Sequence, residues 1–170
     1  MTLFSTGVGL LIAVVLGTAA VAKIREPGPF VTAVGTLVPR AVRKQVAWLV
    51  IGAELLAAVT SLVPATLAFG LALAIVLLAA FAVVALRSAL APAPLPCACF
   101  GSVKASLGWP HVVRNVILTG LAAAGLVTLL AGDQGSAWSQ PALMILVAAI
   151  AVLLAAVAIS VDHLIALFAS

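Results

Sequence analysis

The chain has 170 residues, of which 66% are apolar and 7% are charged, and its mean hydropathy is +1.41. Soluble domains average about 45–50% apolar and about 25% charged residues, so this composition excludes a water-soluble globular domain and indicates an integral membrane protein. The net charge of +4 comes from Lys and Arg residues at the edges of apolar segments, which favours a topology signal over a nucleic-acid-binding surface.

Five apolar segments are long enough to cross a bilayer, because a hydrocarbon core about 30 Å thick needs about 20 apolar residues per helix. The sequence therefore predicts an all-α fold, with residues 1–170 forming a single membrane domain, a polytopic bundle of five transmembrane helices in the lipid bilayer. The predicted spans cover residues 3–22, 46–63, 65–87, 112–131 and 141–161.

The first apolar segment has no basic residue before it and carries Lys23 and Arg25 after it, the reverse of a secretory signal, so it is expected to stay as a membrane helix. Pro27 then opens a stretch with apolar residues at helical spacing that ends at Pro39. This stretch is too short to span the bilayer, so a short interfacial or re-entrant helix is expected after the first span.

Pro64 separates the second and third spans, which are therefore expected to form an antiparallel hairpin. Residues 91–96 contain three prolines and cannot be helical, since each proline removes a backbone donor and restricts the residue before it. This segment leads into a loop that carries both cysteines. Trp109 and Pro110 then open the fourth span, and the fifth ends before Asp162 and His163.

With five spans, every Lys and Arg falls on one side of the membrane. These residues are Lys23, Arg25, Arg40, Arg43, Lys44, Arg87, Lys104 and Arg114. Short connectors rich in Lys and Arg remain cytoplasmic, so the expected location is a bacterial-type plasma (inner) membrane, with the N-terminus outside and the C-terminus in the cytoplasm.

Cys97 and Cys99 are the only cysteines, and they flank one small residue in the proline-limited loop. Two thiols at this spacing can form a strained, readily reduced disulfide, which suits an exchanging pair better than a permanent crosslink. Lys104, Arg114 and the start of the fourth span would stabilise a thiolate if they point at it. The alternative is a pair of inert small residues in a loop.

Glu54 lies near the middle of the second span, where an acid costs about 2.5–3.5 kcal/mol on insertion scales, so it is expected to face the bundle interior. It is either protonated or paired with Lys23 or Arg114, and its role is either proton handling and orientation of the thiol loop or a buried structural pair. Lys23, taken alone, is read as an ordinary positive flank. Arg114 and Asn115 lie near the point where the cysteine loop rejoins the bundle and are candidates to bind loop carbonyls or a thiol partner.

Other polar and aromatic residues are read as structural. Trp48, Trp109 and Trp138 are interpreted as interfacial anchors. His111 and His163 are single residues without a recognisable metal or haem spacing, so neither a metal site nor a cofactor is predicted. The sequence contains no phosphate-binding loop, paired catalytic carboxylates or Ser, His and Asp set, so hydrolase and nucleotide-dependent functions have no support.

Several motifs together resemble the MauE branch of the MauE/DoxX family of redox-associated membrane proteins. They are Ala22-Lys23-Ile24 with a nearby Pro and Phe30, Glu54-Leu55-Leu56, Cys97-Ala98-Cys99-Phe100-Gly101, Trp109 and Arg114-Asn115, and the resemblance covers Leu3 to Ala131. It implies thiol and disulfide handling across the membrane beside a thioredoxin-like partner, and, in methylamine utilisation, maturation of a disulfide-rich periplasmic dehydrogenase subunit. Cys97 and Cys99 would be the redox pair, with Lys23, Glu54, Arg114 and Asn115 as supporting polar residues.

The leading hypothesis is therefore a membrane thiol-disulfide oxidoreductase or electron conduit that supports redox maturation of disulfide-containing extracytoplasmic clients. Two other functions stay open: a soft-metal carrier, since two thiolates also suit Cu(I), and a noncatalytic assembly factor. The charge rule places the thiols on the cytoplasmic side although the implied clients lie outside. Either the pair takes electrons from a cytosolic thioredoxin and the loop dips into the membrane to pass them on, or the topology is inverted.

Overall fold

The computed structural model describes residues 2–91, 108–131 and 145–157. Within these ranges every regular element is a helix, which confirms the predicted all-α fold. The elements are α1 (Thr2–Arg25), α2 (Pro27–Val34), α3 (Arg43–Leu62), the 3-10 turn η1 (Pro64–Thr66), α4 (Leu67–Leu90), α5 (Trp109–Ala131) and an apolar helix over Ile145–Val157. Cys97, Cys99, Lys104, Trp138, Asp162 and His163 lie outside the described residues.

Four helices are long and apolar enough to cross a membrane, as predicted for the first four spans. They are Leu3–Arg25, Arg43–Leu62, Pro64–Leu90 and Trp109–Ala131. The described part of the fifth, Ile145–Val157, rises only about 20 Å at 1.5 Å per residue, less than the roughly 30 Å of a hydrocarbon core. A fifth crossing over residues 141–161 therefore stays a prediction.

The helix after the first span exists but is shorter than expected. It begins at Pro27, a residue preorganised for the first turn of a helix, and ends at Val34 rather than continuing to Pro39. Gly35 follows directly, and the amide of Leu37 bonds the carbonyl of Val34 in a tight turn. Glycine's low helix propensity accounts for the early end.

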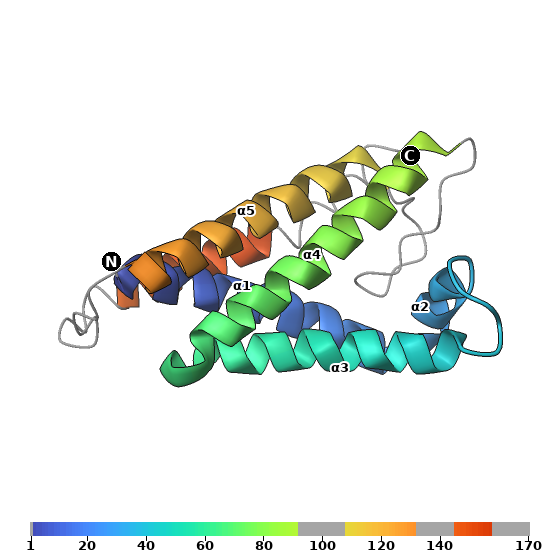
Figure 1. Cartoon of the computed structure of the whole chain (residues 1–170), viewed down its shortest axis with the longest axis horizontal. Helices are drawn as coiled ribbons and strands as arrows, with labels where there is room; N and C mark the ends of the chain where they lie inside the picture. The colour runs from blue at the N-terminus through green and yellow to red at the C-terminus, as the bar shows by residue number, and fades with distance from the viewer. Residues whose placement is uncertain (1, 92–107, 132–144, 158–170) are drawn as a thin grey trace.

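The long helices alternate in direction, so that α1 packs on α3, α3 on α4, α4 on α5, and α5 returns to α1 (Figure 1). The predicted hairpin of the second and third spans is confirmed, with Pro64 in the turn between α3 and α4. Helix α2 folds back along the first half of α3, where Phe30 and Val34 pack against Ala47 and Ile51. Beyond this point α4 and α5 diverge from α2 and α3 toward one end of the bundle (Figure 1).

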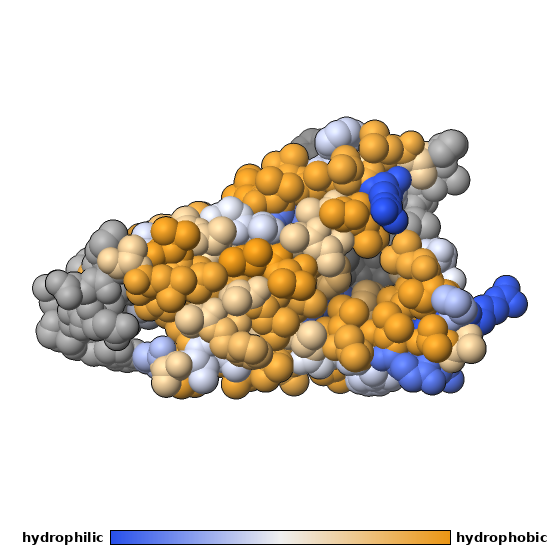
Figure 2. Space-filling model, viewed as in Figure 1, coloured by the Kyte–Doolittle hydropathy of each residue, from blue (hydrophilic) through white to orange (hydrophobic). Residues whose placement is uncertain are grey.

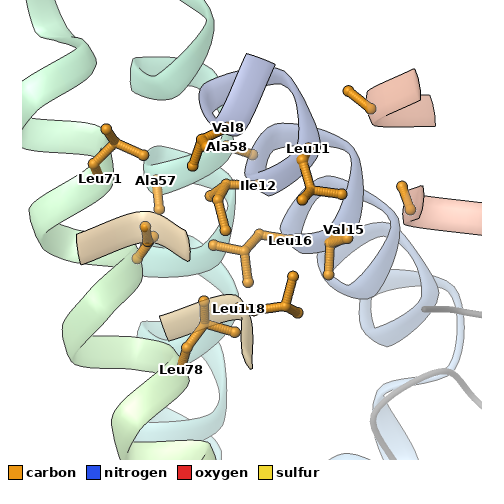
Figure 3. Close-up of a cluster of buried hydrophobic side chains, with 14 of the residues drawn as sticks. Val8, Leu11, Ile12, Val15, Leu16, Ala57, Ala58, Leu71, Leu78 and Leu118 are labelled. Atoms are coloured by element: carbon orange, nitrogen blue, oxygen red, sulfur yellow. The ribbon is translucent and has the colours of Figure 1, made fainter. Parts of the chain in front are cut away.

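The core lies where α1 packs against α3, α4, α5 and the helix Ile145–Val157, and Figure 3 shows most of its residues. Large side chains of α1, such as Ile12 and Leu16, pack against small residues of α3 such as Ala57 and Ala58. Small residues let helix backbones approach closely, which is how membrane helices associate without a hydrophobic driving force.

The face of the molecule seen in Figure 2 is largely apolar over the described helices. Side chains such as Leu49, Val76 and Leu130 are 65–73% exposed. A contiguous apolar surface of this extent is rare on soluble monomers and fits contact with lipid. The strongly hydrophilic residues gather instead at the end of the bundle near α2 (Figure 2).

Gly70 of α4 packs directly against the backbone of α3, and replacing it is expected to destabilise the hairpin. A Cβ atom there would lie 2.6 Å from the backbone nitrogen of Ser61 and 2.8 Å from the carbonyl carbon of Thr60. Gly70→Ala should therefore cost about 1–3 kcal/mol of unfolding free energy through overpacking. Gly52→Ala is the matched control, because nothing lies within 4 Å of its Cβ position. Unfolding of the two detergent-solubilised variants measures the difference, and equal stabilities would contradict this packing.

Candidate functional site

A buried ion pair joins α1 to α3. Lys23, in the last turn of α1, is 1% exposed, and Glu54, in the middle of α3, is 0% exposed. The Lys23 ammonium donates a hydrogen bond to Glu54 Oε1. The prediction that Glu54 faces the interior is confirmed, and of its possible partners the structure pairs it with Lys23.

The interpretation of Lys23 as an ordinary positive flank is wrong. Helix α1 continues to Arg25, three residues beyond the predicted end of the span at residue 22, so Lys23 is a helical residue facing the bundle. A lysine near a helix end commonly extends its charge toward water, but here a buried carboxylate lies within its reach. Charges inside a membrane bundle pair with each other for this reason.

Two aromatic rings also hold the Lys23 ammonium. Its nitrogen lies 4.8 Å from the ring centroid of Phe30 in α2 and 5.0 Å from that of Phe81 in α4. Both distances are within the range of cation-π attraction, which strengthens where water is excluded. One ammonium group thus contacts side chains of α2, α3 and α4.

A cavity of about 20 Å³ lies beside this pair, at the point where α1, α3, α4 and α5 meet. The residues around it are Val15, Leu16, Ala19, Lys23, Glu54, Leu78, Phe81, Arg114 and Asn115. All four predicted supporting residues, Lys23, Glu54, Arg114 and Asn115, therefore come together from α1, α3 and α5. Cys97 and Cys99, the predicted redox pair, lie outside the described residues.

The start of α5 places further polar groups inside the bundle. Asn115 is 4% exposed, and His111, one turn earlier, is 3% exposed. Ser88, near the end of α4, is 1% exposed. Over the described ranges no group of three or more His, Cys, Asp or Glu side chains is placed to hold a metal ion.

Sequence reasoning missed the cavity-facing roles of Phe81 and Ala19. Phe30 was identified as an apolar residue of the short helix and as part of a family motif, but not as a neighbour of Lys23. Nothing in the spacing of the apolar residues distinguished Phe81 from the lipid-facing residues of α4. A buried lysine that lacks water needs an aromatic or acidic neighbour, and this requirement could have directed attention to aromatic residues of the facing helices.

Comparison with family models gives one match, described as methylamine utilisation protein MauE, over residues 1–129 of the 170. The chain belongs to the MauE family. The match covers α1 to α4 and nearly all of α5, so the complete polar cluster of Lys23, Glu54, Arg114 and Asn115 lies within the MauE region. The helix Ile145–Val157 lies after the matched region in the sequence.

Membership of the MauE family confirms the resemblance seen in the sequence motifs, which extended from Leu3 to Ala131. No curated protein and no solved structure matches the chain in the corresponding comparisons. Assignment to MauE therefore rests on the family model and on the motifs themselves.

Proposed function

We propose that this MauE-family protein is a membrane thiol-disulfide oxidoreductase or electron conduit that uses Cys97 and Cys99. The observation that carries the proposal is the convergence of Lys23, Glu54, Arg114 and Asn115 around one cavity inside the bundle. The resemblance to the MauE branch implies that these residues are the polar support of the cysteine pair. Ionisable residues within membrane spans are costly, and a cluster of them indicates a functional site.

The chain connection supports a link between the two thiols and this site. The connector that carries them joins α4, which ends at Leu90, to α5, which begins at Trp109. Cys97 comes six residues after Ala91, so its Cα lies within about 22 Å of Ala91 even in a fully extended chain. Arg114 and Asn115 stand in the second turn of α5, directly after this connector.

The chemistry proposed for the pair is thiol-disulfide exchange. A thiolate of Cys97 or Cys99 attacks one sulfur of a partner disulfide, a mixed disulfide forms, and the other partner sulfur leaves as a thiolate. The second cysteine loses its proton and attacks the sulfur of the first, which forms the Cys97–Cys99 disulfide and releases the partner as a dithiol. Two electrons pass from this chain to the partner, and a thioredoxin-like protein returns them by the reverse exchange.

The buried cluster would fix the positions of the helix ends between which the reaction takes place. The Lys23 contacts fix α1, α2, α3 and α4 relative to one another at the end of the bundle from which the connector starts. Arg114 and Asn115 bring α5 to the same point. Rigid placement of both ends of the connector favours an exchange step that needs the attacking sulfur in line with the disulfide bond.

Intact mass measurement after thiol blocking tests the redox assignment. The purified protein, treated with a diamide-type oxidant and then a maleimide, is expected to carry no maleimide, and to carry two after reduction. A thioredoxin-like protein should move the population between these two forms. A pair that stays doubly modified under every oxidant would contradict the proposal, and tight stoichiometric Cu(I) binding by the reduced protein without exchange would favour the soft-metal carrier instead.

Membrane orientation is a second testable part of the proposal. The ends of α1 and α4 and the starts of α3 and α5 lie at one end of the bundle (Figure 1), and the basic residues of the described helices are at this end. Basic connectors favour the cytoplasm, so we expect this end, with the thiol connector, to face inward. In intact cells a membrane-impermeant maleimide should leave Cys97 and Cys99 unmodified until the membrane is permeabilised; labelling without permeabilisation would establish the inverted topology.

The client proteins are proposed from the family alone. The family description names methylamine utilisation, and redox maturation of disulfide-containing extracytoplasmic proteins is the corresponding role proposed for this chain. An inward-facing dithiol would take electrons from a cytosolic thioredoxin-like protein, and exchange with an extracytoplasmic client would then require the loop to dip into the membrane so that the sulfurs meet.

A further inference from the structure

One oxygen of the buried Glu54 carboxylate has its hydrogen bond, and the other needs one. Glu54 Oε1 accepts from the Lys23 ammonium. Glu54 Oε2 is equally buried and has no hydrogen-bond partner among the described residues. Nearly all buried polar atoms in proteins are satisfied by a protein group or an ordered water, because a buried oxygen without a donor is costly.

The cavity beside Glu54 has the size of one water molecule. The space open to the centre of a water molecule is about 20 Å³. A buried water needs about 10–15 Å³ of such space. The cavity therefore has room for one water.

The lining also has the polarity that a buried water requires. A buried water typically makes about three hydrogen bonds, whereas purely apolar cavities stay dry. Lys23, Glu54, Arg114 and Asn115 all reach the cavity surface, and the remaining side chains around it are apolar. An oxygen that lacks a donor and a polar cavity of matching size occur at the same place.

We infer that this cavity is a specific water-binding site, in which one water donates a hydrogen bond to Glu54 Oε2 and bonds the side-chain amide of Asn115. The water links α3 to α5 through polar contacts in the bilayer-spanning part of the bundle. It thereby holds the first turns of α5 against the pair formed by α1 and α3. This inference goes beyond the proposed thiol chemistry and does not depend on it.

Ala19 offers a way to remove the water without touching a polar group. Ala19 lies on α1, is 6% exposed and lines the cavity. Ala19→Val adds two carbons at the cavity wall and should displace the water, leaving Glu54 Oε2 without a donor. Gly17→Ala is the matched control on the same helix, because its new Cβ would lie at an ordinary 3.7 Å from Ala58 Cβ.

A structure of the full-length wild-type protein, determined at a resolution that shows ordered solvent, tests the inference directly. We expect one solvent peak within hydrogen-bond distance of both Glu54 Oε2 and the Asn115 amide. A peptide or side-chain donor bonded to Oε2 in its place, or a dry cavity, would overturn the inference. Because this measurement uses the wild type, it decides the question even if a variant fails to fold.

Infrared spectroscopy in bilayer nanodiscs provides the matched comparison. Exchange into H₂¹⁸O should shift a sharp O–H stretching band of a buried water in the wild type and in Gly17→Ala. This band should be lost in Ala19→Val, and the apparent melting temperature of that variant should fall by several degrees relative to Gly17→Ala. A band that persists unchanged in Ala19→Val places the water elsewhere and contradicts the inference, whatever the outcome of the thiol experiments.

Discussion

Lys23→Met is expected to lower the unfolding free energy by about 3–5 kcal/mol, because it leaves the Glu54 carboxylate buried without its cationic partner. The large cost comes from the unpaired charge rather than from the lost attraction alone. Met retains most of the aliphatic length of lysine, so the change leaves little cavity between the rings of Phe30 and Phe81. Unfolding of the detergent-solubilised protein by increasing denaturing surfactant measures the effect.

Arg25→Met is the matched control for this variant. Arg25 stands two residues later in the same last turn of α1 but is exposed, so its loss should change stability by no more than about 0.5 kcal/mol. Equal destabilisation by Arg25→Met and Lys23→Met would mean that the net basic charge of this end matters, and not the buried pair.

The double variant Lys23→Met with Glu54→Gln tests whether the two charges affect stability as a pair. Removing both charges together should recover most of the stability lost in Lys23→Met, since neutral replacement of a buried ion pair is often close to neutral in stability. The difference between the double variant and the sum of the single variants gives the coupling energy of the two side chains. Additive single effects would show that Lys23 and Glu54 act independently.

The four long helices followed from composition alone. A hydrophobic run of about 20 residues has one stable form in lipid, because every backbone group must be bonded within the segment. The predicted helix ends differ from the observed ones where basic residues lie inside a helix. The sequence indicates Lys23 and Arg25 as flanks of the span, yet both lie within α1. A basic residue can end a span in the hydropathy pattern without ending the helix.

The polar cluster was only partly predictable from the sequence. The cost of Glu54 within a span indicated a buried partner, and the candidates Lys23 and Arg114 were identified from their position at helix ends. Which of them pairs with Glu54 depends on the relative height and rotation of α1, α3 and α5, and these follow from core packing such as that of Leu16 against α3 and α4. Hydropathy carries no information about these offsets, so it does not distinguish Phe81 or Ala19 as neighbours of the pair.

Replacing both cysteines, Cys97→Ser with Cys99→Ser, is expected to abolish disulfide transfer to and from a thioredoxin-like partner, to the level of vesicles without protein. The hydroxyl of serine cannot form a disulfide, so no route remains for the two electrons. The measurement is the redox state of the partner in proteoliposomes, followed by thiol blocking and gel shift. Retention of wild-type function in cells by this double variant would favour the noncatalytic assembly factor over the exchange mechanism.

The single variants assign the two sulfurs to their steps. If one cysteine attacks and the other resolves, the variant that lacks the resolving thiol should accumulate a mixed disulfide with the partner, and the variant that lacks the attacking thiol should form none. Glu54→Gln should leave this trapping qualitatively intact, because the proposed role of the buried cluster is to place the helix ends and not to carry electrons. Loss of the mixed disulfide in a folded Glu54→Gln protein would instead make Glu54 part of the exchange step, as the acceptor of the proton that the attacking thiol must lose.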